Sequence, residues 1–82
     1  MSWSVYILEC NDKTLYTGIT TDIQKRIEKH NSGKGAKYTR SRLPVVLLLC
    51  KYVGTKSDAL KLEAKIKKHK KCDKLKVLES YK

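Results

Sequence analysis

A pair of short apolar runs near the start of the sequence constrains the fold most. Residues 5–8 and 15–19 are rich in β-branched and aromatic side chains, and the Asn-Asp-Lys segment at 11–13 has the composition of a hairpin turn. We therefore expect the chain to begin with an antiparallel hairpin in which Cys10 pairs with Thr14.

Two tyrosines ten residues apart lie within these runs. Because side chains of a strand alternate with period two, the expected register places Tyr6 and Tyr16 on one face. Tyr6 then lies opposite Gly18 and Tyr16 opposite Leu8, so the phenols are diagonal neighbours and the glycine leaves open space beside the first ring. Tyrosine is also common in ordinary half-buried strands, and these residues alone leave core packing and a reactive pair both open.

The net charge indicates the kind of partner. The chain has 82 residues, enough for one domain over residues 1–82, and 19 Lys and Arg against 8 Asp and Glu give a formal charge of +11. This exceeds what solubility requires, so we expect a polyanionic partner, with DNA the first candidate and RNA the second. An anionic membrane surface or an acidic protein would match the same charge. No apolar stretch approaches the ~20 residues of a transmembrane helix, which excludes a membrane-spanning protein.

The start of the chain and its cysteines indicate the compartment. Residues 1–4 have neither a basic segment nor a cleavable apolar segment, so we expect an intracellular protein, in the cytoplasm or the nucleus. Cys10, Cys50 and Cys72 are odd in number and widely spaced, which fits neither a disulfide framework nor a structural zinc site. We expect reduced thiols, with Cys10 and Cys50 in strands.

Caps and periodicity set the order of elements after the hairpin. Residues 21–24 have the form of a capping box, so a helix is expected from there to the Asn and Gly at 31–33. A basic loop follows at 33–44. The apolar residues 45–53 are the best candidate for a central strand covered on both faces.

The last third of the chain predicts a second helix and a short tail. Ser57 and Asp58 offer an N-cap for a helix ending near Lys71, whereas residues 74–77 fit either a short third helix or a terminal strand. The order is therefore ββαβα plus a short C-terminal element. It predicts an α/β (α+β) fold, with a small three-stranded antiparallel-containing sheet flanked by helices.

Three side chains on the expected helices could carry chemistry. Arg26 and His30 lie four residues apart, so they share a helical face that could reach a cleft at the sheet edge. The ordinary alternative is a solvated arginine and a half-buried histidine at a helix end. Glu63 could bind a divalent cation together with a substrate phosphate, or it could form an i, i+4 salt bridge with Lys67.

Basic residues gather in the loop and in the last third of the chain. The second group is too one-sided for a simple solvated face, so we expect contact with phosphate groups and an affinity that falls steeply with salt. Nothing in either group resembles a base-reading module. The candidate nucleic-acid-binding residues are Lys34, Lys37, Tyr38, Arg40, Arg42, Lys67, Lys70 and Lys71.

Five short motifs occur in a defined order over nearly the whole chain. They are Val5-Tyr6-Ile7, Tyr16-Thr17-Gly18, Arg26-x-x-x-His30-Asn31, the loop at 33–40 and Ala59-Leu60-x-x-Glu63. Either tyrosine tripeptide alone is weak evidence. The ordered set resembles the GIY-YIG nuclease superfamily, in particular its small standalone single-domain members.

The resemblance implies an endonuclease that hydrolyses phosphodiester bonds of DNA with one divalent metal, Mg²⁺ or Mn²⁺. By the same resemblance, Tyr6 would be the general base that takes a proton from the attacking water, and Tyr16 would help to place the phosphate or the water. Arg26 would stabilise charge on the scissile phosphate, and Glu63 would hold the metal. His30 matches a catalytic histidine found in some branches of the family.

Activation of the tyrosine and departures from the family pattern bound the expected activity. An unperturbed phenol has a pKa near 10 and is only ~0.1% ionised at pH 7, so we expect Arg26, nearby lysines and the metal to lower the pKa of Tyr6. The chain lacks the Asn that some members carry after Glu63, and it has Ile19 and Thr20 where some branches use a cation.

The leading functional hypothesis is therefore cleavage with low sequence specificity, on branched or damaged DNA as in DNA repair. The alternative is a catalytically weak or inactive nucleic-acid-binding module of the same fold. A third hypothesis is a basic adaptor protein whose tyrosines only pack in the core.

Overall fold

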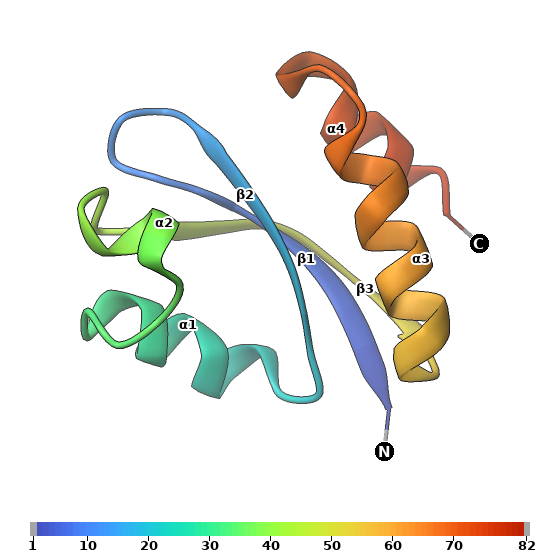
Figure 1. Cartoon of the computed structure of the whole chain (residues 1–82), viewed down its shortest axis with the longest axis horizontal. Coiled ribbons are helices and arrows are strands. Elements are labelled where there is room, and N and C mark those ends of the chain that lie inside the picture. The colour runs from blue at the N-terminus through green and yellow to red at the C-terminus, as the bar shows by residue number, and fades with distance from the viewer. Residues whose placement is uncertain (1, 82) are drawn as a thin grey trace.

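The chain follows the expected order of elements in a computed structural model that describes residues 2–81. The basic loop contains an additional one-turn helix, and the C-terminal tail is helical. The elements are β1 (Trp3–Glu9), β2 (Leu15–Thr20), α1 (Ile23–Asn31), α2 (Lys37–Arg40), β3 (Val46–Gly54), α3 (Lys56–Lys67) and α4 (Lys71–Glu79). The α+β fold with a three-stranded antiparallel sheet and flanking helices is thus confirmed (Figure 1).

The first two strands form the hairpin in the predicted register. Tyr6 pairs with Gly18 and Leu8 with Tyr16. At the turn, the backbone N–H of Cys10 donates to the carbonyl of Thr14 at 2.8 Å. The alternation of apolar side chains and the turn composition therefore identified this part of the fold correctly.

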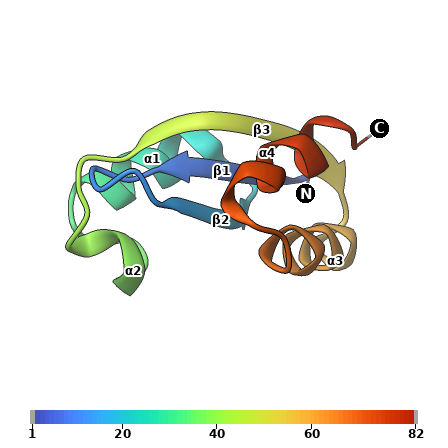
Figure 2. The same cartoon turned by 90° about the horizontal axis from the view of Figure 1, so that it is seen from above.

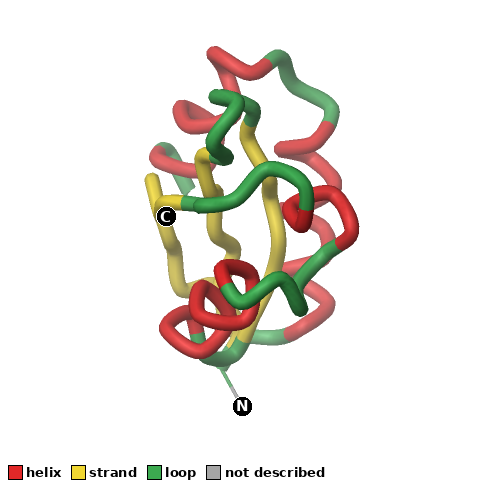
Figure 3. The backbone as a smooth tube through the Cα atoms, turned by 90° about the vertical axis from the view of Figure 1, so that its left-hand side faces the viewer, coloured by secondary structure: helices red, strands yellow, loops and turns green. Residues whose placement is uncertain are grey.

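The third strand is an edge strand, and the prediction that residues 45–53 form the central strand is wrong. The strand order is β2-β1-β3, so β1 lies in the middle of the sheet, whose strands Figure 3 shows side by side in yellow. Side chains of β1 such as Val5 and Leu8 are fully buried, whereas Val46 and Tyr52 of β3 are 58% and 66% exposed. A long apolar run indicates a strand but does not say how many neighbours that strand has.

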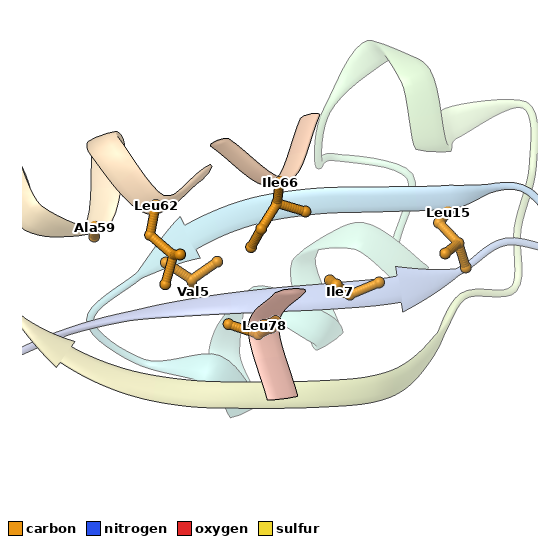
Figure 4. Packing of buried hydrophobic residues seen from close by; sticks show 7 residues of the cluster. All are labelled: Val5, Ile7, Leu15, Ala59, Leu62, Ile66 and Leu78. Carbon is orange, nitrogen blue, oxygen red and sulfur yellow. The ribbon is translucent and has the colours of Figure 1, made fainter. Parts of the chain in front are cut away.

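The sheet separates two groups of helices. Figures 1 and 2 show α1 and α2 toward one end and face of the sheet and α3 and α4 toward the other. The core between the sheet and the second pair is built from side chains of β1, β2, α3 and α4, which Figure 4 shows pointing toward one another. Its buried members are Val5, Ile7, Leu15, Ala59, Leu62, Ile66 and Leu78.

The opposite face of the sheet carries the first tyrosine. Tyr6 and Leu8 are buried there, and Ile23 and Ile27 of α1 pack against them. Successive residues of β1 thus serve two different cores, as the period of two requires. Tyr6 consequently lies on the face that α1 covers.

Side-chain caps fix where the helices begin. Asp22, rather than Thr21, caps α1, and its carboxylate accepts from the backbone N–H of Lys25 at 3.2 Å. The cap of α3 is Thr55, two residues before the expected Ser57, and its hydroxyl accepts from the backbone N–H of Asp58 at 3.1 Å. Both caps satisfy donors that the first helical turn leaves unpaired.

The remaining expectations concern the tail, the thiols and the membrane. Residues 74–77 lie in α4, whose Leu78 is fully buried and so fixes this helix to the core. Cys10, Cys50 and Cys72 are free thiols; Cys50 lies in β3, but Cys10 lies just beyond β1. Within residues 2–81, no helix combines the length and apolar character needed to cross a membrane.

Candidate active site

The glycine opposite Tyr6 makes room for the phenol. A Cβ atom at Gly18 would lie 2.5 Å from the Tyr6 hydroxyl oxygen and 2.6 Å from Cζ, closer than any real side chain allows. The space that the sequence predicted beside this glycine is therefore filled by the end of the tyrosine itself. Tyr6 is only 1% exposed, and the absence of a side chain at Gly18 leaves the space that its hydroxyl group occupies.

Two side chains of α1 bind the hydroxyl group of Tyr6. Arg26 donates from Nε to the phenol oxygen at 3.3 Å, and His30 Nε2 lies 3.1 Å from the same oxygen. The predicted helical face thus brings Arg26 and His30 to the predicted tyrosine. The i, i+4 spacing places both groups one turn apart on the side of α1 that faces the sheet.

The basic loop holds the other side of the histidine ring. His30 is fully buried, and its Nδ1 lies 2.8 Å from the hydroxyl oxygen of Thr39, which itself donates to the carbonyl of Ala36 at 2.9 Å. A Cβ at Gly35 would lie closer than any real contact to the ring, so the loop backbone passes directly against it. Nothing in the sequence indicates a role for Thr39 beyond its place in the motif loop at 33–40.

The second tyrosine completes an aromatic group. The ring centroids of Tyr16 and Tyr6 are 6.4 Å apart, and those of Tyr16 and His30 are 5.3 Å apart in an edge-to-face arrangement. Tyr38 stacks on Tyr16 at 6.0 Å. Both predicted tyrosines and the histidine therefore meet at one place, where edge-to-face packing is favourable.

The protein environment keeps Tyr6 protonated and His30 neutral at pH 7. Burial raises the pKa of Tyr6, and Arg26 opposes this rise only in part. Burial and the neighbouring cations Arg26 and Lys29 lower the pKa of His30. Arg26 thus lowers the pKa of Tyr6 as expected, but desolvation of the phenolate is the larger effect, so in the protein itself the net pKa lies above the ordinary value.

Glu63 of α3 is half-buried and is paired with a lysine. Lys67 Nζ lies 3.5 Å from its carboxylate, so the i, i+4 salt bridge is present, and the charge of Glu63 contributes to the raised pKa of Tyr6. Among the described residues, no group of three or more His, Cys, Asp or Glu side chains could hold a metal. Mg²⁺ is usually bound by one or two carboxylates together with waters and substrate phosphates, so the single carboxylate of Glu63 fits such an ion.

The candidate nucleic-acid-binding residues divide into three groups. Arg42 is tied down: it donates to Asp12 at 2.8 Å and to the carbonyl of Tyr38 at 2.8 Å, and it covers the Tyr38 ring. A hollow of about 400 Å³ beside the tyrosines is lined by Leu15, Tyr16, Thr17, Tyr38, Lys67 and Lys74. The remaining candidates are exposed cations. Lys70 and Lys71 border a separate apolar hollow, together with Leu48 and Leu75. The others lie in the basic loop and are Lys34, Lys37 and Arg40.

Comparison with protein-family models matches residues 2–76 to the GIY-YIG catalytic domain. The chain belongs to the GIY-YIG family. Membership places it in an endonuclease superfamily, whose substrates are nucleic acids. The resemblance drawn from the five motifs is thereby confirmed.

Relatives of this GIY-YIG protein are small proteins of similar length. A UPF0213 protein of Syntrophus aciditrophicus is 57% identical over 76 residues, covering 92% of this chain and 87% of the relative. A UPF0213 protein of Bacillus halodurans, solved by solution NMR, is 44% identical with a TM-score of 0.59, covering 96% of this chain and 84% of that one. A protein from E. faecalis, also solved by NMR, is 39% identical with a TM-score of 0.68, covering 98% and 85%.

Proposed function

We propose that this GIY-YIG protein acts, as a single domain over residues 1–82, as a metal-dependent endonuclease that hydrolyses phosphodiester bonds of DNA with low sequence specificity. The observation that carries the proposal is the buried phenol of Tyr6, whose oxygen lies between the Nε–H of Arg26 and Nε2 of His30. Such a phenol can receive a proton and pass one on, which an ordinary core tyrosine has no need to do.

Each polar group at the site has a role in this reaction. Tyr6 is the base that takes a proton from the attacking water, and Arg26 stabilises negative charge on the phenol oxygen and on the phosphate. Tyr16 borders both Tyr6 and the adjoining hollow, so it helps to position the phosphate. Glu63 would hold Mg²⁺ or Mn²⁺, which when bound neutralises charge on the phosphate and stabilises the leaving oxygen.

The substrate follows from the charges around this site. Exposed lysines and arginines attract the phosphate backbone without distinguishing bases, so affinity for DNA is strong at low salt and nearly independent of sequence. Branched and damaged DNA are the first substrates to test.

The proposal is tested by cleavage assays on single-stranded, duplex, nicked and branched DNA, with and without Mg²⁺ or Mn²⁺. We expect Tyr6→Phe and Glu63→Ala each to lower the rate by about 100-fold or more. The matched controls are Tyr52→Phe and Glu79→Ala, whose side chains are exposed and lie away from the site. Equal cleavage by all four variants would identify a contaminating nuclease and end the catalytic assignment.

A second candidate function is nucleic-acid binding with little or no turnover. It is favoured by the raised pKa of Tyr6 and by the salt bridge that engages Glu63. DNA binding in the presence of EDTA, combined with no cleavage of any substrate in the panel with metal, would select this alternative.

A further inference from the structure

The geometry points to Thr39 as a positioning residue: its hydroxyl group fixes the tautomer of His30 in which Nε2 is free to accept the proton of Tyr6. The inference deepens the proposed nuclease function and rests on it for its chemistry, but the tautomer itself is a property of the protein without DNA.

The partners of the Tyr6 hydroxyl group fix which atom donates and which accepts in each hydrogen bond of this network. The phenol oxygen is buried and has two partners, Nε of Arg26 and Nε2 of His30. The guanidinium can only donate, so the proton of the phenol has His30 Nε2 as its acceptor. If Nε2 were protonated instead, the buried O–H of Tyr6 would lose the only acceptor that residues 2–81 offer it, which is costly.

On the far side of the His30 ring, the direction of the hydrogen bond to Thr39 follows from the same rule. A neutral histidine with Nε2 unprotonated carries its proton on Nδ1, which lies 2.8 Å from the hydroxyl oxygen of Thr39. The Thr39 oxygen can accept a hydrogen bond from Nδ1–H, because its own hydroxyl hydrogen is donated to the carbonyl of Ala36 at 2.9 Å. From Arg26 through Tyr6, His30 and Thr39 to the carbonyl of Ala36, each group then donates to the next, and every hydrogen has an acceptor.

The loop fixes the position of the Thr39 hydroxyl group beside His30. Its side chain is fully buried, and its backbone N–H donates to Ala36 at 3.1 Å within the turn that begins α2. Gly35 lets the loop pass directly against His30, since any Cβ there would overlap the ring. This gives the motif loop a second task besides its cations: it orients the histidine.

His30 remains neutral in this arrangement. The groups that face it are Tyr6 from β1, Tyr16 from β2, and Arg26 and Lys29 from its own helix. No carboxylate is among them, and burial and the cations lower its pKa, so the ring can accept a proton near pH 7.

In the reaction, the proton transfers balance as follows. As the oxygen of the attacking water forms its bond to phosphorus, the water proton passes to the phenol oxygen of Tyr6 and the phenol proton passes to His30 Nε2. One P–O ester bond breaks, and the leaving oxygen takes a proton from solvent. Thr39 accepts from Nδ1 throughout, so His30 changes charge without turning.

The test compares Thr39→Val, which keeps the shape and removes the hydroxyl group, with Thr39→Ser, which retains it. The first measurement is the ¹⁵N NMR signals of the His30 ring in the protein without DNA. We expect the Nδ1–H tautomer in the natural chain and in Thr39→Ser, and a mixture of tautomers in Thr39→Val. The Nε2–H tautomer in the natural chain, or an unchanged tautomer in Thr39→Val, would overturn the inference.

The second measurement is cleavage as a function of pH. For Thr39→Val we expect kcat to fall on the order of 10- to 100-fold with little change in KM, and the acid limb of the pH profile to move. An unchanged kcat together with the altered tautomer would also contradict the inference. Absence of cleavage by the natural chain, with the Nδ1–H tautomer present, would overturn the proposed nuclease function and leave the positioning by Thr39 supported.

Discussion

The ability of Tyr6 to act as a base depends on the two partners of its hydroxyl oxygen, Arg26 and His30. In the protein alone, burial raises its pKa more than Arg26 lowers it, so the phenol is neutral at pH 7. A neutral phenol is a useful base only if its own proton leaves as another arrives, and His30 is placed to receive it. The residue therefore works as one member of a chain of proton donors and acceptors.

Burial of His30 makes the stability of the protein depend on pH. Its pKa is lower in the folded protein than the value near 6.5 of the unfolded chain, so below about pH 6.5 the unfolded state binds more protons. The contribution is therefore fully present above pH 6.5 and is lost as the pH falls toward the folded pKa. Urea unfolding from pH 8 to 5 should show a decline in the free energy of unfolding that is weaker in His30→Gln.

The control for this titration is His69→Gln, because His69 is only half-buried, lies just after α3, and has its Nδ1 2.8 Å from the backbone carbonyl of Lys65. This variant should keep the decline of the natural chain. Equal slopes in His30→Gln and the natural chain would show that His30 is not the titrating group.

Sequence spacing predicted some of these residues and missed others for a physical reason. Arg26 and His30 share a helical face at a fixed period, and the hairpin register fixed Tyr6, so their meeting was predictable. Thr39 lies in a loop, where no period relates position to direction, and its role depends on the carbonyl of Ala36 and the ring of His30. Such contacts appear only once the loop conformation is known.

Among the elements, the hairpin and the third strand differ in what their sequences determine. The turn and the alternation fix the pairing of β1 with β2, whereas the apolar run of β3 gives no information on its outer neighbour. The chain reaches β3 through the loop, and its start is held by α1. The side chain of Asn31 accepts from the backbone N–H of Val45 at 2.8 Å and donates to its carbonyl at 3.3 Å.

Asn31 therefore connects the end of α1 to the start of β3. Asn31→Ala removes both hydrogen bonds and leaves the partly buried backbone of Val45 unpaired, so we expect a loss of about 1–3 kcal/mol in the free energy of unfolding. Asn11→Ala, at the exposed hairpin turn, is the matched control and should change it by less than about 0.5 kcal/mol. Urea denaturation measures both, and equal effects would show that this connection contributes nothing specific.

For the molecule as a whole, the net charge of +11 is distributed unevenly around the site. Lys67 and Lys74 line the hollow beside Tyr16, whereas Lys56 lies at the other end of α3, where its ammonium is 5.3 Å from the centre of the Trp3 ring. If DNA passes over the tyrosines, Lys67 and Lys74 at the hollow neutralise its phosphates, whereas the distant Lys56 does not. Composition predicts the total charge, but only the fold decides which lysines lie near the site.

Salt dependence of binding separates these two positions. Each phosphate that a lysine neutralises contributes about −0.9 to the slope of log K against log salt concentration on duplex DNA. Lys74→Gln should therefore weaken binding at low salt and reduce the magnitude of this slope by roughly one. Lys56→Gln removes the same charge from the total and should leave the slope nearly unchanged. Fluorescence anisotropy with labelled duplex DNA, in EDTA to prevent cleavage, measures both variants. Equal slopes for Lys74→Gln and Lys56→Gln would mean that DNA responds to the overall charge alone and does not follow a path across the hollow.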